Sequence, residues 1–420
     1  MGLIKLDILG LSTLDVIQIA KDKVKERHGK TLDLLSVPLN DEKVLDAFAQ
    51  GKTVGVFQFT SGGMRSLLKQ FGEGGRKLTF EDVYAATALY RPGPLQSGMT
   101  EEYVRIKQGI VKPHYEHPKM EPALRETRGI IVYQEQVMQI ARDLCGYTMG
   151  ESDKLRKVMG KKLPEEMEKQ REKFVAGAVK CSDMEESHAS HLFDQIAKFA
   201  GYGFNKSHSV AYTLISYLCM YLKHYYPAEF FAASLSIVKE DALTPIVKDA
   251  AEHGVYVVPP CVNNSTDTFE IGYDDKREQH ILYAPLNRVK QVSEKGTAMI
   301  LRVREEIGGR FTSKKHFIES IEKRYCNKRA QDNLNAVGAF CDIDDEAIDP
   351  RHPDRLKDQK ELIPNLMLNN VKASRYIDLK TVKEEIVKLS KEIQAEATTK
   401  KDSQPVSHRS SLIMAPDPSL

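Results

Sequence analysis

A compact group of basic residues is the feature of this sequence most suggestive of chemistry. Residues 151–167 read ESDKLRKVMGKKLPEEM, and the part from 154 to 163 contains no acid but five cations: Lys154, Arg156, Lys157, Lys161 and Lys162. Arginine binds phosphate oxygens through its planar fork, and lysine adds positive charge. The pattern therefore suits a polyanion such as a triphosphate, and it is equally typical of a solvated basic face.

The same stretch predicts how these cations are positioned. On a helix, Lys154 and Lys157 share one face and Arg156 lies at its edge. Gly160 is expected to end that helix, so the last two lysines would lie just beyond its C-terminus. Pro164 is expected to start the next helix.

A second group of polar residues lies at the predicted start of a long helix in residues 200–236. Ser207 is its expected N-cap, and Asn205, Lys206 and His208 gather at the same end. Free N–H groups and the positive end of the helix dipole can hold a phosphate there. The aromatic residues that follow have a spacing that favours core packing over base stacking. His208 alone is more typical of a helix-cap partner than of a catalyst.

Arg91 stands in ALYRPGPLQSGM, residues 88–99, directly before two prolines that flank a glycine. Such a segment predicts a stiff, tight loop. An arginine on it can clamp a phosphate or the template, or it can be a buried structural residue. The spacing does not separate these two interpretations.

A single carboxylate interrupts the strand-like run LIKLDILGLS, residues 3–12. With a period of two, Lys5 and Asp7 point to the same face, opposite an apolar face. Ser12 and Asp15 then predict a capping box and a helix to about Arg27. Asp7 would thus lie near a strand–helix junction, although the residues alone favour a surface Lys–Asp pair on an edge strand.

Composition limits the classes of protein to consider. A chain of 420 residues suggests two to four domains, and 61 Lys and Arg against 59 Asp and Glu identify no partner, so any nucleic-acid surface must be local. Six separated cysteines without a CxxC pair indicate reduced thiols. Without a signal peptide or a run of about 18 uncharged apolar residues, the chain is expected in the cytoplasm, away from membranes.

The expected fold is mainly α, with a short β-strand near the N-terminus and a small α+β segment. Helices are predicted to open at Asp41 and at a capping box of Thr79 and Asp82. Residues 53–59, TVGVFQF, favour a strand. Residues 130–235 are expected to be almost wholly helical. Short strands in GVYVVPP, TFEI and HILYAPL are expected to follow, and then short helices over 290–340.

Seven motifs in this order resemble the bacterial C-family replicative DNA polymerases, the family of the DNA polymerase III alpha subunit. The similarity runs from Lys5 to about Phe340. The motifs are KLDILGLSTLDVI, TVGVFQFTSGGMRSLL, ALYRPGPLQSGM, GIIVYQEQVMQIA, LRKVMGKK, GYGFNKSHSVAYTLISYLCMYLKHYYPAEFFAASL and YVVPPCVNNS.

The resemblance implies an organisation of four parts. Residues 1–30 would be a remnant of the palm with its short β-strand, and 31–240 the helical fingers. Residues 241–345 would be a degenerate helix-hairpin-helix region, with Gln291 and Ser293 where hairpin glycines are expected. Residues 346–420 would form an acidic linker, a lone helix at about 380–394 and a disordered tail.

The resemblance also implies an activity, DNA-directed DNA polymerisation, in which dNTPs are added to a primer by two-metal phosphoryl transfer. Asp7 would be one of three catalytic carboxylates and a Mg²⁺ ligand, and Lys5 would meet the triphosphate. Arg156 and Lys157 match an arginine pair of the fingers, and Lys154, Lys161 and Lys162 would add to nucleotide binding. DNA or phosphate would be bound by Arg91, Asn205, Lys206, Ser207 and His208.

The family's other two catalytic carboxylates lie in an upstream Asp-x-Asp motif. The only match in these 420 residues is at Asp342–Asp344, in the wrong part of the chain. The active site is therefore expected to be incomplete in this chain alone, as in the product of a split or truncated gene. An N-terminal polymerase fragment would complete the two-metal site.

Other expected partners follow from the same resemblance. They are primer–template DNA, dNTPs, a sliding clamp and other replisome subunits, in a bacterial or phage-infected cell. The stretch QKELI at 359–363 is a weak candidate for clamp binding. The alternative function is that of a non-catalytic DNA-binding or decayed polymerase fragment.

Overall fold

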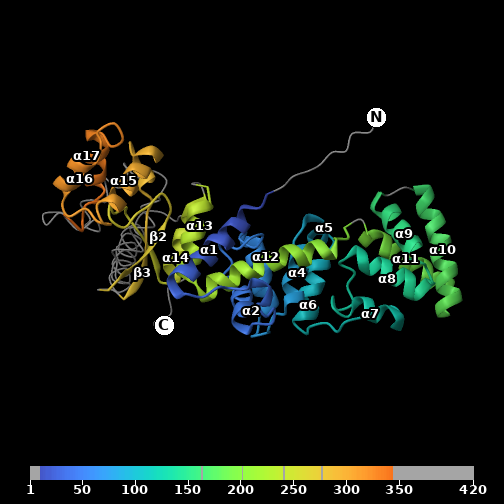
Figure 1. The fold of residues 1–420 in the computed structure, drawn as a ribbon. Helices are drawn as coiled ribbons and strands as arrows, with labels where there is room; N and C mark the ends of the chain where they lie inside the picture. The colour runs from blue at the N-terminus through green and yellow to red at the C-terminus, as the bar shows by residue number, and fades with distance from the viewer. Residues whose placement is uncertain (1–9, 162–163, 201, 240–241, 276–277, 344–420) are drawn as a thin grey trace, which may run out of the picture.

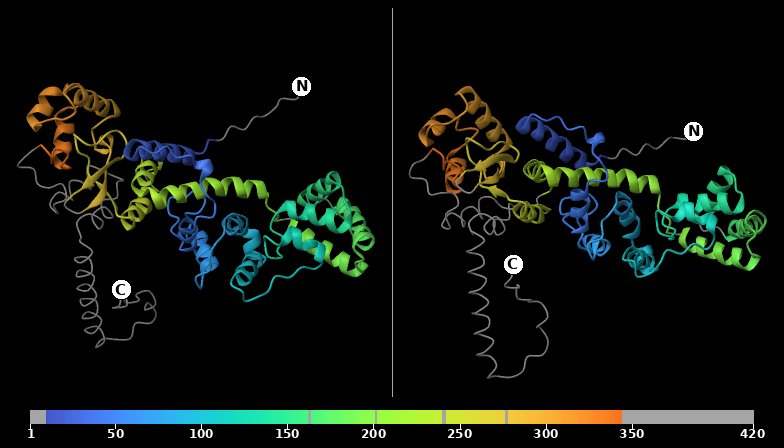
Figure 2. Two further views of the ribbon diagram at one scale, coloured as in Figure 1. Left: turned by 60° about the horizontal axis from the view of Figure 1, so that its bottom comes forward. Right: turned by 90° about the horizontal axis from the view of Figure 1, so that it is seen from below.

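The computed structural model describes residues 10–161, 164–200, 202–239, 242–275 and 278–343. Lys5, Asp7, Lys162, the helix predicted at 380–394 and QKELI lie outside these ranges. The described chain is elongated, with three groups of elements arranged along its length (Figures 1 and 2).

The central group is built on the long helix α12 (Lys206–Tyr225), against which α2, α4 and α13 pack. Buried side chains of α12 such as Tyr217, Cys219 and Leu222 belong to the main hydrophobic core. The other helices of this group are α1 (Ser12–His28), α2 (Glu42–Ala49), α3 (Gly62–Gly72), α4 (Phe80–Leu89), α5 (Pro92–Gln96), α6 (Met99–Lys107) and α13 (Pro227–Ile237). A short 3₁₀ turn, η1 (Leu34–Ser36), connects α1 to α2.

A second group has a hydrophobic core of its own, in which Ile140, Leu155, Phe174 and Phe193 are buried. It lies at the far end of α12 from the sheet (Figure 1). Its elements are η2 (Pro118–Met120), α7 (Glu121–Leu124), α8 (Gln134–Cys145), α9 (Met149–Lys161), α10 (Pro164–Ser182) and α11 (Glu186–Ala200).

The third group combines a small sheet with short helices. The strand order is β1-β3-β2, with β1 parallel and β2 antiparallel to β3, so the β2–β3 hairpin adds to β1 through β3. The elements are α14 (Leu243–Glu252), β1 (Val255–Val258), β2 (Glu270–Asp274), β3 (Gln279–Tyr283), η4 (Leu286–Arg288), α15 (Glu294–Glu306), α16 (Lys314–Ser320) and α17 (Lys328–Ala336).

The predicted fold class, mainly α with a small α+β segment, is confirmed. The capping box of Thr79 and Asp82 and the Asp41 cap are both present. The capping box predicted for α1 is wrong, because the N-cap is Leu11 and no side chain caps this end. The helix nevertheless ends where expected, at Gly29 with φ +65°.

The strand predicted at 53–59 is wrong, since this segment folds as successive turns. Its backbone carbonyls are bound by side chains rather than by another strand. Ser216 Oγ donates to Phe57 O at 2.7 Å, and Lys223 Nζ donates to Val54 O at 2.9 Å. Lys223 is itself buried and pairs with Asp249 at 2.6 Å. Side chains of α12 thus satisfy backbone groups that would otherwise pair in a sheet.

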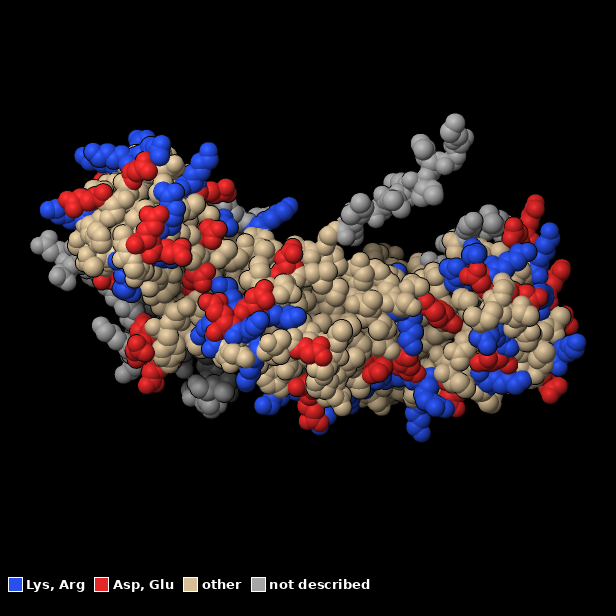
Figure 3. All heavy atoms as spheres, viewed as in Figure 1, with Lys and Arg blue, Asp and Glu red and all other residues tan. Residues whose placement is uncertain are grey.

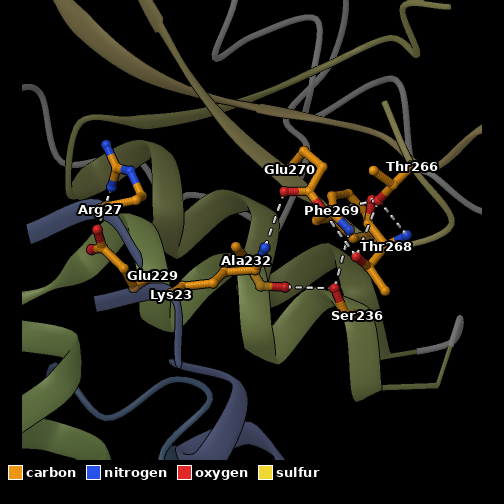
Figure 4. Close-up of polar contacts among 9 residues, drawn as sticks. All are labelled: Lys23, Arg27, Glu229, Ala232, Ser236, Thr266, Thr268, Phe269 and Glu270. Carbon is orange, nitrogen blue, oxygen red and sulfur yellow. Dashed lines mark hydrogen bonds and ion pairs between the residues drawn. The ribbon is translucent and has the colours of Figure 1, made fainter. Parts of the chain in front are cut away.

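Polar contacts join α1 to α13 and to the start of β2 (Figure 4). The buried carboxylate of Glu229 on α13 pairs with Arg27 and, at 2.9 Å, with His28 Nε2 of α1. Lys23 Nζ lies 3.1 Å from a carboxylate oxygen of Glu270 on β2. These contacts fix the position of α1, which directly follows the segment that carries Asp7.

None of the helices in the described part of the chain has the length and the apolar character that crossing a membrane requires.

Candidate nucleotide and DNA interface

The cations of α9 are partly neutralised by an acid that the sequence analysis left out of the group. Asp153 Oδ1 accepts from Arg156 Nη2 at 2.7 Å, and Asp153 Oδ2 lies 2.6 Å from Lys157 Nζ. Hydrogen bonds from Lys157 and Arg156 lower the pKa of the Asp153 carboxyl. The expected absence of a neutralising acid is therefore wrong, because residues three and four positions apart are neighbours on a helix.

The end of this helix also differs from its prediction. α9 continues through Gly160 to Lys161, so Gly160 does not terminate it. A glycine inside a helix costs only about 1 kcal/mol relative to alanine, which the packing of a long helix can offset. Lys154 is exposed, like Lys157 beside it. The side chains of Lys161 and Lys162 lie outside the described part.

The N-terminus of α12 is capped by Asn205 and not by Ser207 as predicted. Asn205 Oδ1 accepts from the backbone N–H of His208 at 2.7 Å, while Ser207 is exposed. A carboxylate already occupies the first free donor of the helix, since Glu135 accepts from the Lys206 N–H at 2.9 Å. Glu135 also accepts from Asn205 Nδ2 at 2.8 Å. The N-terminus of α12 can therefore bind an anion, and the Glu135 carboxylate occupies this position.

Two further side chains at this helix end have partners. Lys206 Nζ lies 2.5 Å from Glu126, whose other oxygen accepts from the Tyr84 hydroxyl. Burial and this carboxylate raise the pKa of Tyr84. The His208 ring stacks on Tyr212 with centroids 4.2 Å apart. Lys206 is thus held toward the protein, while the His208 ring contacts both Tyr212 and Phe204 and remains exposed.

Arg91 supports the turn that precedes α12. Its Nη2 donates to Tyr202 O at 2.7 Å, its Nε donates to Ala88 O at 2.9 Å, and its guanidinium lies 4.3 Å from the centroid of the Phe204 ring. Burial lowers its pKa. These contacts give Arg91 a structural role. The expected loop after it is wrong, because the two prolines start the short helix α5.

The predicted residues from α9 and α12 meet through Gln134 at the start of α8. Gln134 Oε1 accepts from Arg156 Nη1 at 3.3 Å, and its Nε2 donates to Gly203 O at 3.1 Å. The Gln134 N–H donates to Phe204 O at 2.9 Å. Arg91, Arg156 and the start of α12 therefore surround one turn, 202–205. We call the turn and the residues around it the 202–205 cluster, which consists of Arg91, Glu126, Gln134, Glu135, Asp153, Arg156 and residues 202–208.

Three polar residues of this cluster were not among the sequence candidates: Glu126, Gln134 and Glu135. The only signal for the last two was the motif GIIVYQEQVMQIA, where they stand between apolar residues at the start of a helix. Their partners lie about 70 residues away, so local pattern did not reveal their role.

Comparison with known proteins identifies the family of this chain. The profile of the "Bacterial DNA polymerase III alpha subunit finger domain" matches residues 13–182, and that of the "Helix-hairpin-helix motif" matches 254–347. DNA polymerase III subunit alpha of Yersinia pestis is 43% identical over 90% of this chain. The chain belongs to the bacterial DNA polymerase III alpha family.

Other members of the family match over a similar part of the chain. The Aquifex aeolicus alpha subunit is 42% identical over 81% of it, and the Thermus aquaticus subunit 42% over 83%. The chain corresponds to 37% of the Yersinia subunit and to 28% of the other two. It thus spans about a third of these relatives, and the α9 cations lie within the match to their fingers.

The helix-hairpin-helix match over 254–347 contains one locally basic stretch, although the matched range as a whole is close to neutral. Residues 286–330 contain twelve Lys and Arg against five Asp and Glu, a local net charge of +7 in a nearly neutral chain. Figure 3 shows blue side chains over α15, α16 and α17, with red side chains among them. This is a local positive footprint of the kind that a DNA backbone requires.

Two residues in this region, Gln291 and Ser293, stand where hairpin glycines were expected. Gln291 has φ +70°, a left-handed conformation that favours glycine. Ser293 caps α15, with its Oγ accepting from the Gly296 N–H at 3.0 Å. Gln291 thus takes the place of a glycine at the cost of backbone strain, whereas Ser293 takes the place of a glycine by capping α15.

Replacing Gln291 with glycine is expected to raise the free energy of unfolding by about 0.5–1 kcal/mol. A left-handed non-glycine residue costs about 1–2 kcal/mol, and the added entropy of glycine in the unfolded chain offsets about half of that. Urea unfolding of the two proteins measures the change. Gln331→Gly, inside α17, is the matched control and should destabilise, and a loss of stability in Gln291→Gly would contradict the expectation.

Proposed function

We propose that this chain acts as the fingers and helix-hairpin-helix part of a bacterial replicative DNA polymerase, which adds dNTPs to a primer on a DNA template in the cytoplasm. The observation that carries the proposal is the 202–205 cluster, where Gln134 joins the fork of Arg156 to the turn before α12, and Arg156 lies in the match to polymerase fingers over 13–182. Two independent anion-binding features at one place favour a ligand with several phosphates.

The carboxylates of the cluster fit this role. Asp153 holds Arg156 and Lys157, and Glu135 holds the first N–H of α12, so each anion-binding group is oriented before nucleotide arrives. A triphosphate carries more charge than either carboxylate and presents several oxygens at once. We propose that it replaces Asp153 at Arg156 and Lys157, with Lys154, Lys161 and Lys162 adding positive charge at the helix end.

Lys206, Ser207, His208 and Asn205 at the start of α12 are proposed to contact the DNA or nucleotide phosphates. In our proposal Arg91 contributes by holding the turn that positions them, because its guanidinium already binds Tyr202 O and Ala88 O. The +7 region over 286–330 is proposed to bind the backbone of the primer–template duplex.

We propose that Asp7 is a Mg²⁺ ligand, with Lys5 two positions before it in the sequence. Both residues lie outside the described part of the chain. Bound Mg²⁺ would supply charge stabilisation to the transferring phosphoryl group. Asp7 would be one of the three carboxylates expected from the family. We propose that the Asp-x-Asp pair comes from polypeptide beyond these 420 residues, whether in the same gene product or in a separate chain, with a sliding clamp and other replisome subunits as further partners.

Arg156→Ala is the test of this proposal. In an enzyme completed by a palm that carries Asp-x-Asp, it should raise the KM for dNTPs about 10- to 100-fold, since a hydrogen bond to a charged group is worth about 1.5–3 kcal/mol. The Kd for primer–template DNA should stay close to that of the unchanged protein. Steady-state extension kinetics and DNA-binding titrations measure the two quantities.

Arg171 on α10 offers a matched control, because it is also an arginine paired with an aspartate, Asp194, but lies away from the 202–205 cluster. Arg171→Ala should leave the KM for dNTPs unchanged. Equal losses of dNTP and DNA affinity in Arg156→Ala would instead identify α9 as a general DNA surface, as expected of a non-catalytic DNA-binding fragment.

A further inference from the structure

Three metal-binding side chains meet at one place in the third group of elements. Cys261 follows β1, and Cys341 and Asp342 follow α17. The two Sγ atoms and a carboxylate oxygen of Asp342 all lie within 4.8 Å of one another. Cys261 is buried, with 1% of its surface exposed, whereas Cys341 is half-buried and Asp342 reaches the surface. Within the described ranges, no other group of three or more His, Cys, Asp or Glu side chains converges in this way.

The segments that carry these side chains are fixed relative to one another. The Val262 N–H donates to Ala339 O at 2.9 Å, which ties the turn after β1 to the segment after α17. The Asn263 side chain binds the Phe311 backbone from both sides, donating to its carbonyl at 3.0 Å and accepting from its N–H at 2.8 Å. Arg304 Nη1 donates to Val262 O at 3.1 Å. The three ligands are thus held in place by backbone contacts of their own segments.

Outer contacts orient two of the ligands. Asp342 Oδ2 accepts from Asn263 Nδ2 at 3.0 Å and from Arg310 Nη2 at 2.8 Å. Asn264 Nδ2 donates to Cys261 Sγ at 3.3 Å. Hydrogen bonds to ligating carboxylates and sulfurs are the usual outer shell of a metal centre, where they set the direction of each ligand.

We propose that Cys261, Cys341 and Asp342 bind one Zn²⁺ ion. Two thiolates and one carboxylate are a donor set for zinc, whereas Mg²⁺ and Ca²⁺ take oxygen ligands alone. Binding releases the two thiol protons to solvent, and the carboxylate is already ionised. Two thiolates, one carboxylate and Zn²⁺ carry a net charge of −1, which the guanidinium of Arg310 balances. A water molecule takes the fourth position, because the group opens to the surface at Asp342.

This zinc site is independent of nucleotide binding, and the bound ion would stabilise the folded chain. The ion joins the turn after β1 to the segment after α17, so it closes the part of the chain that matches the helix-hairpin-helix profile. Zinc that binds the folded form alone stabilises it, and a free concentration of a hundred times Kd raises the ratio of folded to unfolded chain about 100-fold.

The test uses the full reduced chain in a Cys181→Ser background, which removes the exposed thiol. Co²⁺ replaces Zn²⁺ as the spectroscopic probe. The expected result is uptake of one Co²⁺ per chain, a thiolate-to-cobalt charge-transfer absorption, displacement of Co²⁺ by Zn²⁺, and a higher Tm with Zn²⁺. Cys261→Ser and Cys341→Ser should each abolish the absorption, and Asp342→Asn should weaken Co²⁺ binding at least about 10-fold.

Cys326→Ser is the matched control, because Cys326 is buried in the same group of elements but outside the cluster. It should leave the absorption and the Zn²⁺-dependent rise in Tm unchanged. The proposal is overturned if the reduced chain gives no charge-transfer absorption, if the absorption persists in both Cys261→Ser and Cys341→Ser, or if the two thiols only form a disulfide and bind no metal when reduced.

Discussion

Asp7→Asn is expected to reduce the rate of primer extension by more than about 100-fold. Loss of a residue that only hydrogen-bonds to a metal ligand costs about 10- to 100-fold, and loss of a direct ligand should cost more. Asparagine keeps the shape of aspartate but removes the charge that a Mg²⁺ ligand contributes. Asp7 stands in KLDILG, the motif that resembles the palm strand of the family. The affinity for primer–template DNA should not change, because the basic surface over 286–330 is untouched.

Primer extension should be measured with the chain alone, with the chain and a palm polypeptide that carries Asp-x-Asp, and with the same mixture containing Asp7→Asn. The chain alone should add no nucleotide, since one carboxylate cannot hold two divalent ions about 4 Å apart. Asp15→Asn is the matched control on the exposed surface of α1. Extension by the lone chain, or full activity of the Asp7→Asn mixture, would contradict the role of Asp7.

Asp82→Asn is expected to lower the free energy of unfolding by about 3–5 kcal/mol, the usual cost of removing one partner from a buried ion pair. The Asp82 side chain is fully buried, with Lys107 Nζ at 2.6 Å and Arg128 Nη2 at 2.8 Å. The Tyr103 hydroxyl donates to it at 3.1 Å, and the Thr79 N–H at 3.0 Å. Asparagine would leave two cations without their counter-charge and weaken the cap of α4.

The contribution of Asp82 to the free energy of unfolding should also depend on pH. Burial alone would raise its pKa, but the charges of Arg128 and Lys107 outweigh burial and hold the pKa below its ordinary value. The stabilisation is therefore fully present above the ordinary carboxyl pKa of about 4, and it is lost as the pH falls through the lowered value.

Urea unfolding from about pH 6 to about pH 3 measures this dependence. The difference in free energy of unfolding between the unchanged protein and Asp82→Asn should shrink as the pH falls. Asp22→Asn is the matched control, because Asp22 is exposed on α1, and its difference should stay small throughout. A difference that is constant over the whole range would show that Asp82 stabilises by packing and not by charge.

Features whose contacts are local in the chain could be predicted from the sequence. The caps of α2 and α4 bind N–H groups two or three residues away, so Asp41 and Thr79 identify them directly. The helices between 130 and 235 and the three short strands follow from their apolar periodicity. The cations of α9 stand out in the sequence, and their role in nucleotide binding stays a prediction, while their partner Asp153 was missed because it stands one position before the group.

Other features depend on groups that are distant in the chain, and the tertiary structure alone decided them. TVGVFQF has the composition of a strand, but Ser216 and Lys223, 159 and 169 residues along the chain from Phe57 and Val54, bind its carbonyls. Glu135 fills the N-terminus of α12 from 71 residues away. Sequence pattern reports how a segment can fold, whereas packing decides which distant polar group satisfies its backbone, because a buried N–H or C=O group must find a partner wherever the fold provides one.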